Sequence, residues 1–314
     1  MIQRNATDPN RSALRLAFTR SARSAWRLIL ETTTFAPGTS LLVPAYIGIT
    51  DREGSGISDP IEQTRTPFTL YALNDSLSPN HDELEEMLAT RNHPLLLVVH
   101  YFGVVQVDLE RLYSACRRHD AIMIEDCAHV PGPLRRSGGP GTVGDAAIYS
   151  LHKSIAVPSG GILRVNCPTL ALPDPLPTDR CDPGCLEQLV RTDMVDVATR
   201  RRKNYRWLSD RLANVDGLTI MYPDPILGEL VPHDFPVRIH DGLREKLYFA
   251  LMAEDLPTIA LYYRLIDAIT LQAFPRSHAL SKEILNLPVH QDTEIADLER
   301  LCERLVSILG RLRI

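Results

Sequence analysis

Two apolar stretches that end in chemically active side chains constrain this chain more than any other feature. Residues 121–124 form an apolar run of strand type that stops at the acid pair Glu125 and Asp126. A second apolar strand, expected over 145–151, leads into Lys153. Ligands of open α/β sheets bind at the carboxyl ends of the strands, so we expect the acid pair and the lysine to face one site.

The segments around these stretches predict an α/β fold. Residues 95–102 are a continuous apolar run of strand length, a helix with one apolar face is expected over 109–116, and the strand from residue 121 follows. A strand, helix, strand order implies right-handed crossovers between parallel strands, and continuous apolar strands are typical of sheets covered on both faces. We therefore expect a mostly parallel sheet sandwiched by helices. Further strands are expected at 40–43, 68–73 and 161–165, and helices begin near Ser24 and after Asn80.

The C-terminal part predicts a smaller α+β domain. Five prolines between residues 167 and 185 exclude a helix or a central strand, so this segment is interpreted as a linker between domains. A long helix is expected over 186–212, and short strands at 219–221 and 235–239 alternate with helices at 243–253 and 295–312. The predicted domains are 1–185 and 186–314.

Composition limits the classes of partner. The 314 residues carry a net charge of −5, which argues against nucleic acid or an anionic membrane as the main partner. No apolar run approaches the about 18 residues of a membrane span, and the N-terminus lacks the apolar core of a signal peptide. We expect a cytoplasmic protein with small-molecule substrates.

The six cysteines are expected to be reduced thiols. Cys181 and Cys185 lie four apart, but no second pair of metal ligands lies near them in the sequence, so no metal is expected. Cys127 is interpreted as a small core residue.

The residues alone leave alternatives open. Arg23, near the start of the first predicted helix, belongs either to a solvated basic face or to a helix N-terminus that binds an anion such as phosphate. Asp126 and Lys153 are compatible with ordinary structural roles. They are also compatible with pyridoxal phosphate, which takes a Schiff-base lysine and a carboxylate against its ring nitrogen.

Six stretches, in order and spacing, resemble one known family. The chain looks like the DegT/DnrJ/EryC1/StrS sugar aminotransferases, within the fold type I pyridoxal-phosphate enzymes. The matching stretches are SARSAW at 21–26, LLVPAY at 41–46, VVHYFG at 98–103, MIEDCAH at 123–129, GDAAIYSLHK at 144–153 and ILNLPVHQD at 284–292.

The resemblance implies a role for each matching position. The catalytic group would be Lys153 as Schiff-base lysine and proton-transfer base, Asp126 against the pyridine nitrogen, and His129 near the phenolic oxygen. The remaining cofactor contacts would be Ala128 on the ring face, Ser150, Ala22 and Arg23 at the phosphate, and Tyr46 and His100 as looser candidates for the walls. Weaker candidates are His152, Tyr262, Tyr263 and Arg264.

The implied function is transfer of an amino group from an amino acid such as glutamate to a keto group, plausibly on a nucleotide-linked sugar, by a homodimer. Another pyridoxal-phosphate reaction (elimination, decarboxylation or condensation) and a non-catalytic regulatory or scaffold protein stay open as alternatives.

Four features depart from the family pattern. The N-terminal arm is missing, the segment from Ser150 to Lys153 is two residues shorter, Ala22 stands where glycine is frequent, and REGSG at 52–56 replaces a helix-forming sequence. They bear on the substrate more than on the cofactor.

Overall fold

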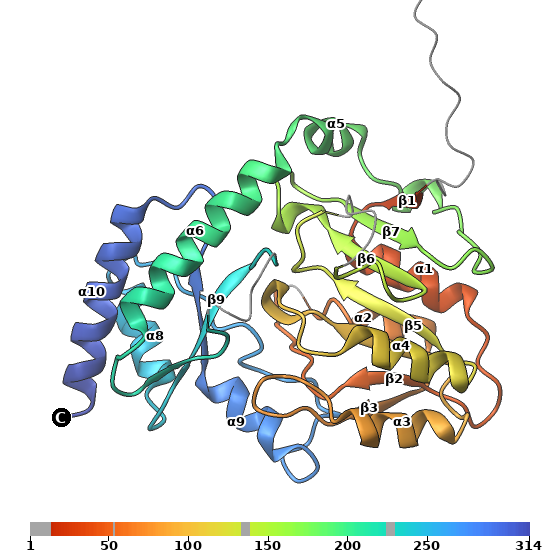
Figure 1. Cartoon of the computed structure of the whole chain (residues 1–314), viewed down its shortest axis with the longest axis horizontal. Coiled ribbons are helices and arrows are strands. Elements are labelled where there is room, and N and C mark those ends of the chain that lie inside the picture. Colours follow the sequence, from red (N-terminus) through yellow and green to blue (C-terminus); the bar gives the residue numbers. More distant parts are fainter. Residues whose placement is uncertain (1–13, 53, 133–138, 224–229) are drawn as a thin grey trace, which may run out of the picture.

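A seven-stranded sheet forms the larger part of the molecule (Figure 1). The computed structural model describes residues 14–52, 54–132, 139–223 and 230–314. The strands lie in the order β1-β7-β6-β5-β4-β2-β3. Their bounds are β1 (Arg15–Thr19), β2 (Leu41–Pro44), β3 (Phe68–Tyr71), β4 (Leu95–Val99), β5 (Ile122–Cys127), β6 (Ala146–Ser150) and β7 (Gly161–Val165). Neighbours from β6 to β3 are parallel, whereas β7 is antiparallel to both β6 and β1. The predicted mostly parallel sheet is confirmed.

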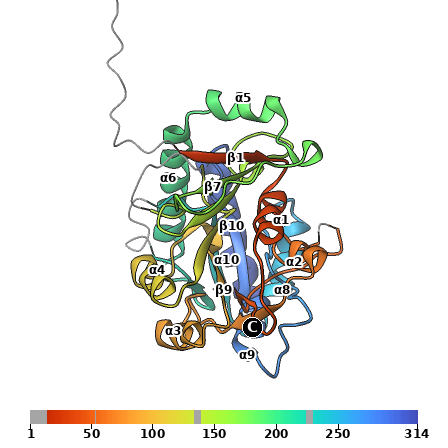
Figure 2. The same ribbon diagram turned by 90° about the vertical axis from the view of Figure 1, so that its right-hand side faces the viewer.

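Helices cover both faces of this sheet. Figure 2 shows α1 (Ala22–Thr32) and α2 (Ser58–Thr64) on one side and α3 (His81–Ala89) and α4 (Leu109–Arg118) on the other. The helices begin where the sequence supplies caps: the side chains of Asn80 and Asp108 accept hydrogen bonds from the first turns of α3 and α4. All residues of β2, β4, β6 and β7 are buried, as expected for strands covered on both faces.

A second, smaller sheet lies in the C-terminal part, beside the first (Figure 1). It is antiparallel, in the order β10-β9-β8, from β8 (Leu218–Ile220), β9 (Asp234–Ile239) and β10 (Ile284–Pro288). Its helices are α6 (Met194–Leu212), α8 (Arg244–Met252), α9 (Pro275–Glu283) and α10 (Ile295–Leu312). The smaller α+β part is therefore present, and the boundary between residues 185 and 186 stays a prediction.

The single helix expected over 186–212 is wrong. The chain forms α5 (Pro183–Arg191) and α6, separated by Thr192 and Asp193. The Asp193 carboxylate accepts hydrogen bonds from the main-chain N–H groups of Val195 and Asp196. Because a side chain of this kind caps a new helix rather than continuing an old one, the break is local in origin.

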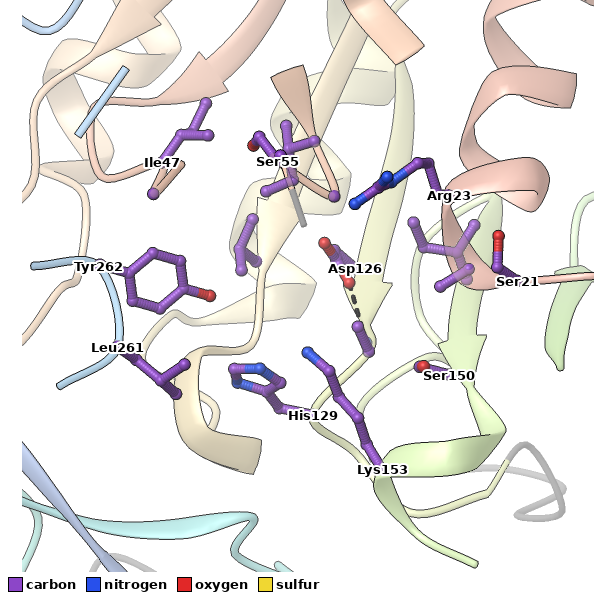
Figure 3. A pocket seen from close by; sticks show the side chains of 18 of the residues that line it. Ser21, Arg23, Ile47, Ser55, Asp126, His129, Ser150, Lys153, Leu261 and Tyr262 are labelled. Atoms are coloured by element: carbon purple, nitrogen blue, oxygen red, sulfur yellow. Dashed lines mark hydrogen bonds between the residues drawn. The ribbon is translucent and has the colours of Figure 1, made fainter. Parts of the chain in front are cut away.

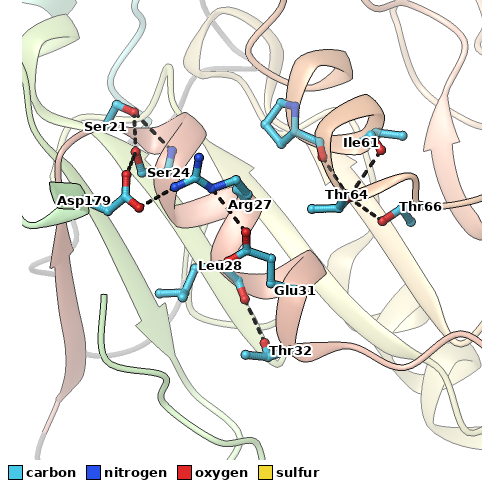
Figure 4. A network of polar contacts seen from close by, with 11 residues as sticks. Ser21, Ser24, Arg27, Leu28, Glu31, Thr32, Ile61, Thr64, Thr66 and Asp179 are labelled. Atoms are coloured by element: carbon cyan, nitrogen blue, oxygen red, sulfur yellow. Dashed lines mark hydrogen bonds and ion pairs between the residues drawn. The ribbon is translucent and has the colours of Figure 1, made fainter. Parts of the chain in front are cut away.

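The proline-rich segment, interpreted from the sequence as a linker between domains, makes contacts with the large sheet and with α1. Arg15 of β1 donates to the carbonyls of Cys167 and Leu170, each at 2.8 Å. Asp179 pairs with Arg27 and accepts from Ser24, both on α1 (Figure 4). The Arg15 contacts depend on β1, a strand that the sequence did not predict because its alternating arginines also suit an amphipathic helix.

No helix within the described ranges is long and apolar enough to cross a membrane. Residues 1–13, on which the expectation of no signal peptide was based, and residue 53 of the REGSG stretch lie outside those ranges.

Candidate active site

A cavity of about 370 Å³ lies at the carboxyl ends of β4, β5 and β6. It brings together most of the side chains expected at the site. The sequence-predicted residues that line it are Ala22, Arg23, His100, Asp126, Ala128, His129, Ser150, His152, Lys153 and Tyr262. Figure 3 shows Asp126, His129 and Lys153 converging on its centre.

Asp126 lies inside β5, which runs beyond the expected end at residue 124. Its side chain is buried, and Oδ1 accepts a hydrogen bond of 2.8 Å from the main-chain N–H of Ala128. Burial raises the pKa of this carboxyl, and the Ala128 N–H and the charge of Lys153 oppose the rise without overcoming it. A buried acid of this kind is ready to pair with a cationic ring nitrogen, which would restore its charged form.

Glu125, the other member of the acid pair, faces a different set of groups. It accepts hydrogen bonds from His100 Nε2 at 2.8 Å and from the main-chain N–H groups of Gly141, Val143 and Gly144 at 2.6 to 3.0 Å. Burial raises the pKa of Glu125, but the bonds from His100, Gly141 and Gly144 outweigh it and leave the pKa below its usual range. Glu125 therefore holds the His100 ring in the cavity wall.

His129 is held as a neutral hydrogen-bond donor. Its Nδ1 accepts from the N–H of Phe102 at 3.1 Å, which leaves the proton of the neutral ring on Nε2. Burial lowers its pKa well below the usual value, and the charges of Lys153, His233 and Arg201 add to this effect. The side chain can therefore donate to an oxygen in the cavity across the physiological pH range.

Lys153 ends a short turn, η2 (Leu151–Lys153), that follows β6. The N–H groups of Ser154 and Ile155 both bond to the carbonyl of Leu151 at 2.9 Å. This compact turn replaces the longer segment expected from the family pattern and still directs Lys153 into the cavity toward Asp126 and His129 (Figure 3).

The first turn of α1 forms one end of the cavity. Ser21 caps this helix, and Ala22 and Arg23 follow it at the cavity wall. Unpaired N–H groups of a helix start favour an anion such as phosphate. Ser150 lies at the same end, with Oγ 3.2 Å from Nδ1 of His152. Gly161 is required here, because a Cβ at this position would overlap the main chain of Ser21 and Ala22.

The remaining walls of the cavity contain Ser55, which the sequence analysis did not single out, and Tyr262, which it gave as a weaker candidate. The loop from Ile47 to Ile57 contributes Ser55, whose N–H bonds to Asp59 at 2.9 Å, while Asp59 pairs with Arg23 at 3.2 Å. Tyr262 has a left-handed backbone, with φ of 59°, and directs its phenol into the cavity (Figure 3). A non-glycine residue with this φ is a strained feature that often marks a functional site.

Three sequence candidates lie outside the cavity. Tyr46 is fully buried behind Tyr262, with ring centroids 5.1 Å apart, so it supports the wall and does not line it. Tyr263 is exposed, and exposed Arg264 pairs with Asp51 at 2.7 Å. Tyr262 and Tyr263 are adjacent in the sequence, but only Tyr262 lines the cavity, and the sequence does not indicate which of the two rings points inward.

The residues present fit pyridoxal phosphate by the chemistry of the donor set. A buried carboxylate, a neutral imidazole donor, a lysine and a helix start with hydroxyls match the cofactor's ring nitrogen, phenolic oxygen, aldehyde and phosphate. With a mostly parallel sheet beneath them, these groups define a fold type I pyridoxal-phosphate enzyme.

The family model of the DegT/DnrJ/EryC1/StrS aminotransferase family matches residues 61–172 and 185–306. The chain therefore belongs to this family of pyridoxal-phosphate-dependent aminotransferases.

Named relatives agree with this assignment. The chain is 23% identical to GDP-perosamine synthase of Caulobacter vibrioides in an alignment of 321 positions, gaps included, that covers 91% of this chain and 83% of that protein. It is 36% identical over 78 residues, 25% of this chain, to a putative L-glutamine:3-amino-2,3-dideoxy-scyllo-inosose aminotransferase of Micromonospora echinospora. That match spans 18% of the relative's length.

Solved structures show the same fold. The aminotransferase TlmJ from Streptoalloteichus hindustanus has a TM-score of 0.77 at 19% identity, covering 96% of this chain and 87% of that one. The PLP form of putative sugar aminotransferase Spr1654 from Streptococcus pneumoniae also has a TM-score of 0.77, at 15% identity, covering 95% and 87%.

Proposed function

We propose that this chain transfers an amino group from an amino acid such as glutamate to a keto group of a nucleotide-linked sugar. The convergence of Asp126, His129 and Lys153 in one cavity is the observation that carries the proposal. The relatives named above support a sugar acceptor, since one is a GDP-perosamine synthase and another is named for a scyllo-inosose.

Each residue has a defined task in this proposal. Lys153, Asp126 and His129 would hold pyridoxal phosphate, which would supply an electron sink for the substrate's Cα. Asp126 keeps a proton on the ring nitrogen, and His129 donates from Nε2 to the phenolic oxygen. The Nζ amine of Lys153 would act as the base that accepts a proton from the substrate's Cα and returns it during the transfer.

Binding and exclusion of water fall to the cavity ends. Ser150, Arg23 and the α1 start hold the phosphate, with His152 as a further contact from the short turn. Apolar Ile47 and Leu261, together with Tyr262, line the opposite side and restrict water there. Ala128 packs against the ring face.

Three further expectations belong to this proposal. We propose a homodimer, as the family resemblance implies, and a cytoplasmic location. The division into a cofactor domain, 1–185, and a smaller domain, 186–314, is proposed from the five prolines between residues 167 and 185.

Cofactor titration tests the proposal directly. The purified protein should acquire a visible absorbance band with pyridoxal phosphate, and Lys153→Ala should lose it while keeping its fold by circular dichroism. Adding glutamate should convert the cofactor to pyridoxamine phosphate, detected by chromatography, and a sugar nucleotide bearing a keto group should reverse that conversion. A protein that binds no cofactor would refute the proposal, and cofactor binding without pyridoxamine phosphate from any amino donor would favour another pyridoxal-phosphate reaction or a non-catalytic role.

A further inference from the structure

A buried guanidinium lies directly beneath the turn that carries Lys153. Arg201 of α6 has an exposed fraction of 0%, although arginine is almost never fully buried without a partner. Within the described ranges no carboxylate forms an ion pair with Arg201. Burial lowers its pKa to about 10, and the more distant charges of Asp234 and Asp292 only partly offset this effect. Burying this guanidinium costs free energy, so its hydrogen bonds, rather than an ion pair, indicate its role.

The donors of Arg201 go to three neutral acceptors around the lysine turn. Nη2 donates to the main-chain carbonyl of Lys153 at 2.9 Å, Nε donates to Oε1 of Gln291 at 2.8 Å, and Nη1 donates to Nδ1 of His233 at 3.3 Å. Gln291 in turn donates to the carbonyl of Ser154 at 3.3 Å. Two successive carbonyls of the turn are thus held by side chains from the C-terminal part of the chain.

The segment that carries Gln291 is itself held in place by hydrogen bonds from α6. Asn204, one turn along α6 from Arg201, donates to the carbonyls of His290 and Thr293 at 3.0 and 3.2 Å, which places Gln291 between them. The planar guanidinium offers its donors in a fixed fork, a geometry that lysine cannot reproduce.

We propose that Arg201 is a positioning residue, which holds the main chain of Lys153 through a closed set of hydrogen bonds with Gln291 and Ser154 and so orders the short lysine turn. The contacts themselves are independent of the reaction, and the relevance of the ordered turn to cofactor binding rests on the proposed function.

Hydrogen exchange of the cofactor-free protein tests the ordering. Arg201→Met should speed exchange of the amides of Ser154 and Ile155 by about tenfold, because a charge-assisted bond that holds their turn is lost, while exchange in β5 and α10 stays unchanged. Arg200→Met is the matched control, since Arg200 lies next to Arg201 on α6, is exposed and pairs, among the residues that the structure describes, only with Asp196 of the same helix. Unchanged exchange at the turn, or a uniform rise across the whole molecule, would overturn the proposal.

Two further measurements complete the test. Arg201→Lys keeps the charge but not the forked donor geometry, so it should still speed exchange at the turn. This variant decides the question if Arg201→Met does not fold. Unchanged exchange in Arg201→Lys would then count against the proposal. In folded Arg201→Met the dissociation constant for pyridoxal phosphate should rise about tenfold, and an unchanged constant would show that the turn's order is irrelevant to the cofactor. If the unaltered protein binds no cofactor, the proposed function fails while the exchange result still decides the role of Arg201.

Discussion

Substituting Glu125 by glutamine should destabilise the cofactor-free protein by about 2 to 4 kcal/mol. The glutamine carbonyl can keep the bonds from Val143 and Gly144 that now end on Oε1. The amide NH₂ then replaces Oε2 and confronts the N–H of Gly141, a donor that bonds to Oε2 at 2.6 Å. The Gly141 N–H loses its charge-assisted bond and stays buried without an acceptor, which costs about 1 to 3 kcal/mol. The bonds that Val143 and Gly144 keep become neutral and weaker, which adds about 1 kcal/mol.

The hydrogen bond between His100 and residue 125 can be kept in the Glu125→Gln variant. Nε2 of His100 can accept from the new NH₂ if the ring proton moves to Nδ1, which is buried and has no hydrogen-bond partner in the described part of the chain. The tautomer change therefore limits the loss at this contact, and most of the destabilisation comes from Gly141.

Urea unfolding followed by circular dichroism measures this effect. Glu85→Gln is the control, because Glu85 pairs with Arg118 at the surface and its loss should leave the unfolding midpoint nearly unchanged. The pH dependence gives a second check. The folded pKa of Glu125 is lowered, so its stabilisation is present above the unfolded value of about 4.3 and is lost as the pH falls through the folded value. A loss below about 0.5 kcal/mol at pH 7 would refute this account of the Glu125 contacts.

Two other outcomes follow from the structure. Gly161→Ala should destabilise the protein by more than about 2 kcal/mol because its Cβ meets main-chain atoms of Ser21, whereas Gly310→Ala, in open space on α10, should stabilise it by about 0.5 to 1 kcal/mol; equal effects in thermal unfolding would contradict this. Burial raises the pKa of Asp234 to about 6, so its contribution to stability is present at low pH and lost as the pH rises through that value. Asp234→Asn should therefore gain about 1 kcal/mol relative to the unaltered protein between pH 5 and pH 8, and a pH-independent difference would argue against it.

The sequence predicted the centre of the site better than its edges. Asp126 lies near the end of β5, and Lys153 follows the end of β6. Because these two buried strands are adjacent and parallel, the local apolar pattern was enough to predict that the two side chains meet. Arg201 and Gln291 contact the lysine turn although they lie 48 and 137 residues further along the chain than their partners Lys153 and Ser154. Such contacts depend on how two sheets pack, which no local pattern encodes.

Local ambiguity explains the other differences. Alternating arginine and aliphatic residues suit both an amphipathic helix and an edge strand, and pairing with β7 selects the strand at Arg15–Thr19. Tyr262 lines the cavity, and Tyr46 packs against Tyr262 from outside, with ring centroids 5.1 Å apart. Aromatic composition alone carries no information on which ring lines the cavity.

The edge pairing of β1 with β7 has a consequence for biosynthesis. Arg15 pairs with Val165, so a segment that leaves the ribosome early must wait for its partner strand before it gains main-chain hydrogen bonds. The α1 start at the proposed phosphate site is anchored to this strand and to Asp179, so it is fixed in place only after synthesis has passed that residue. Translation of the C-terminal residues up to Gln291 must then follow before the lysine turn is fully held. The nascent chain should therefore acquire its cofactor late, close to release from the ribosome.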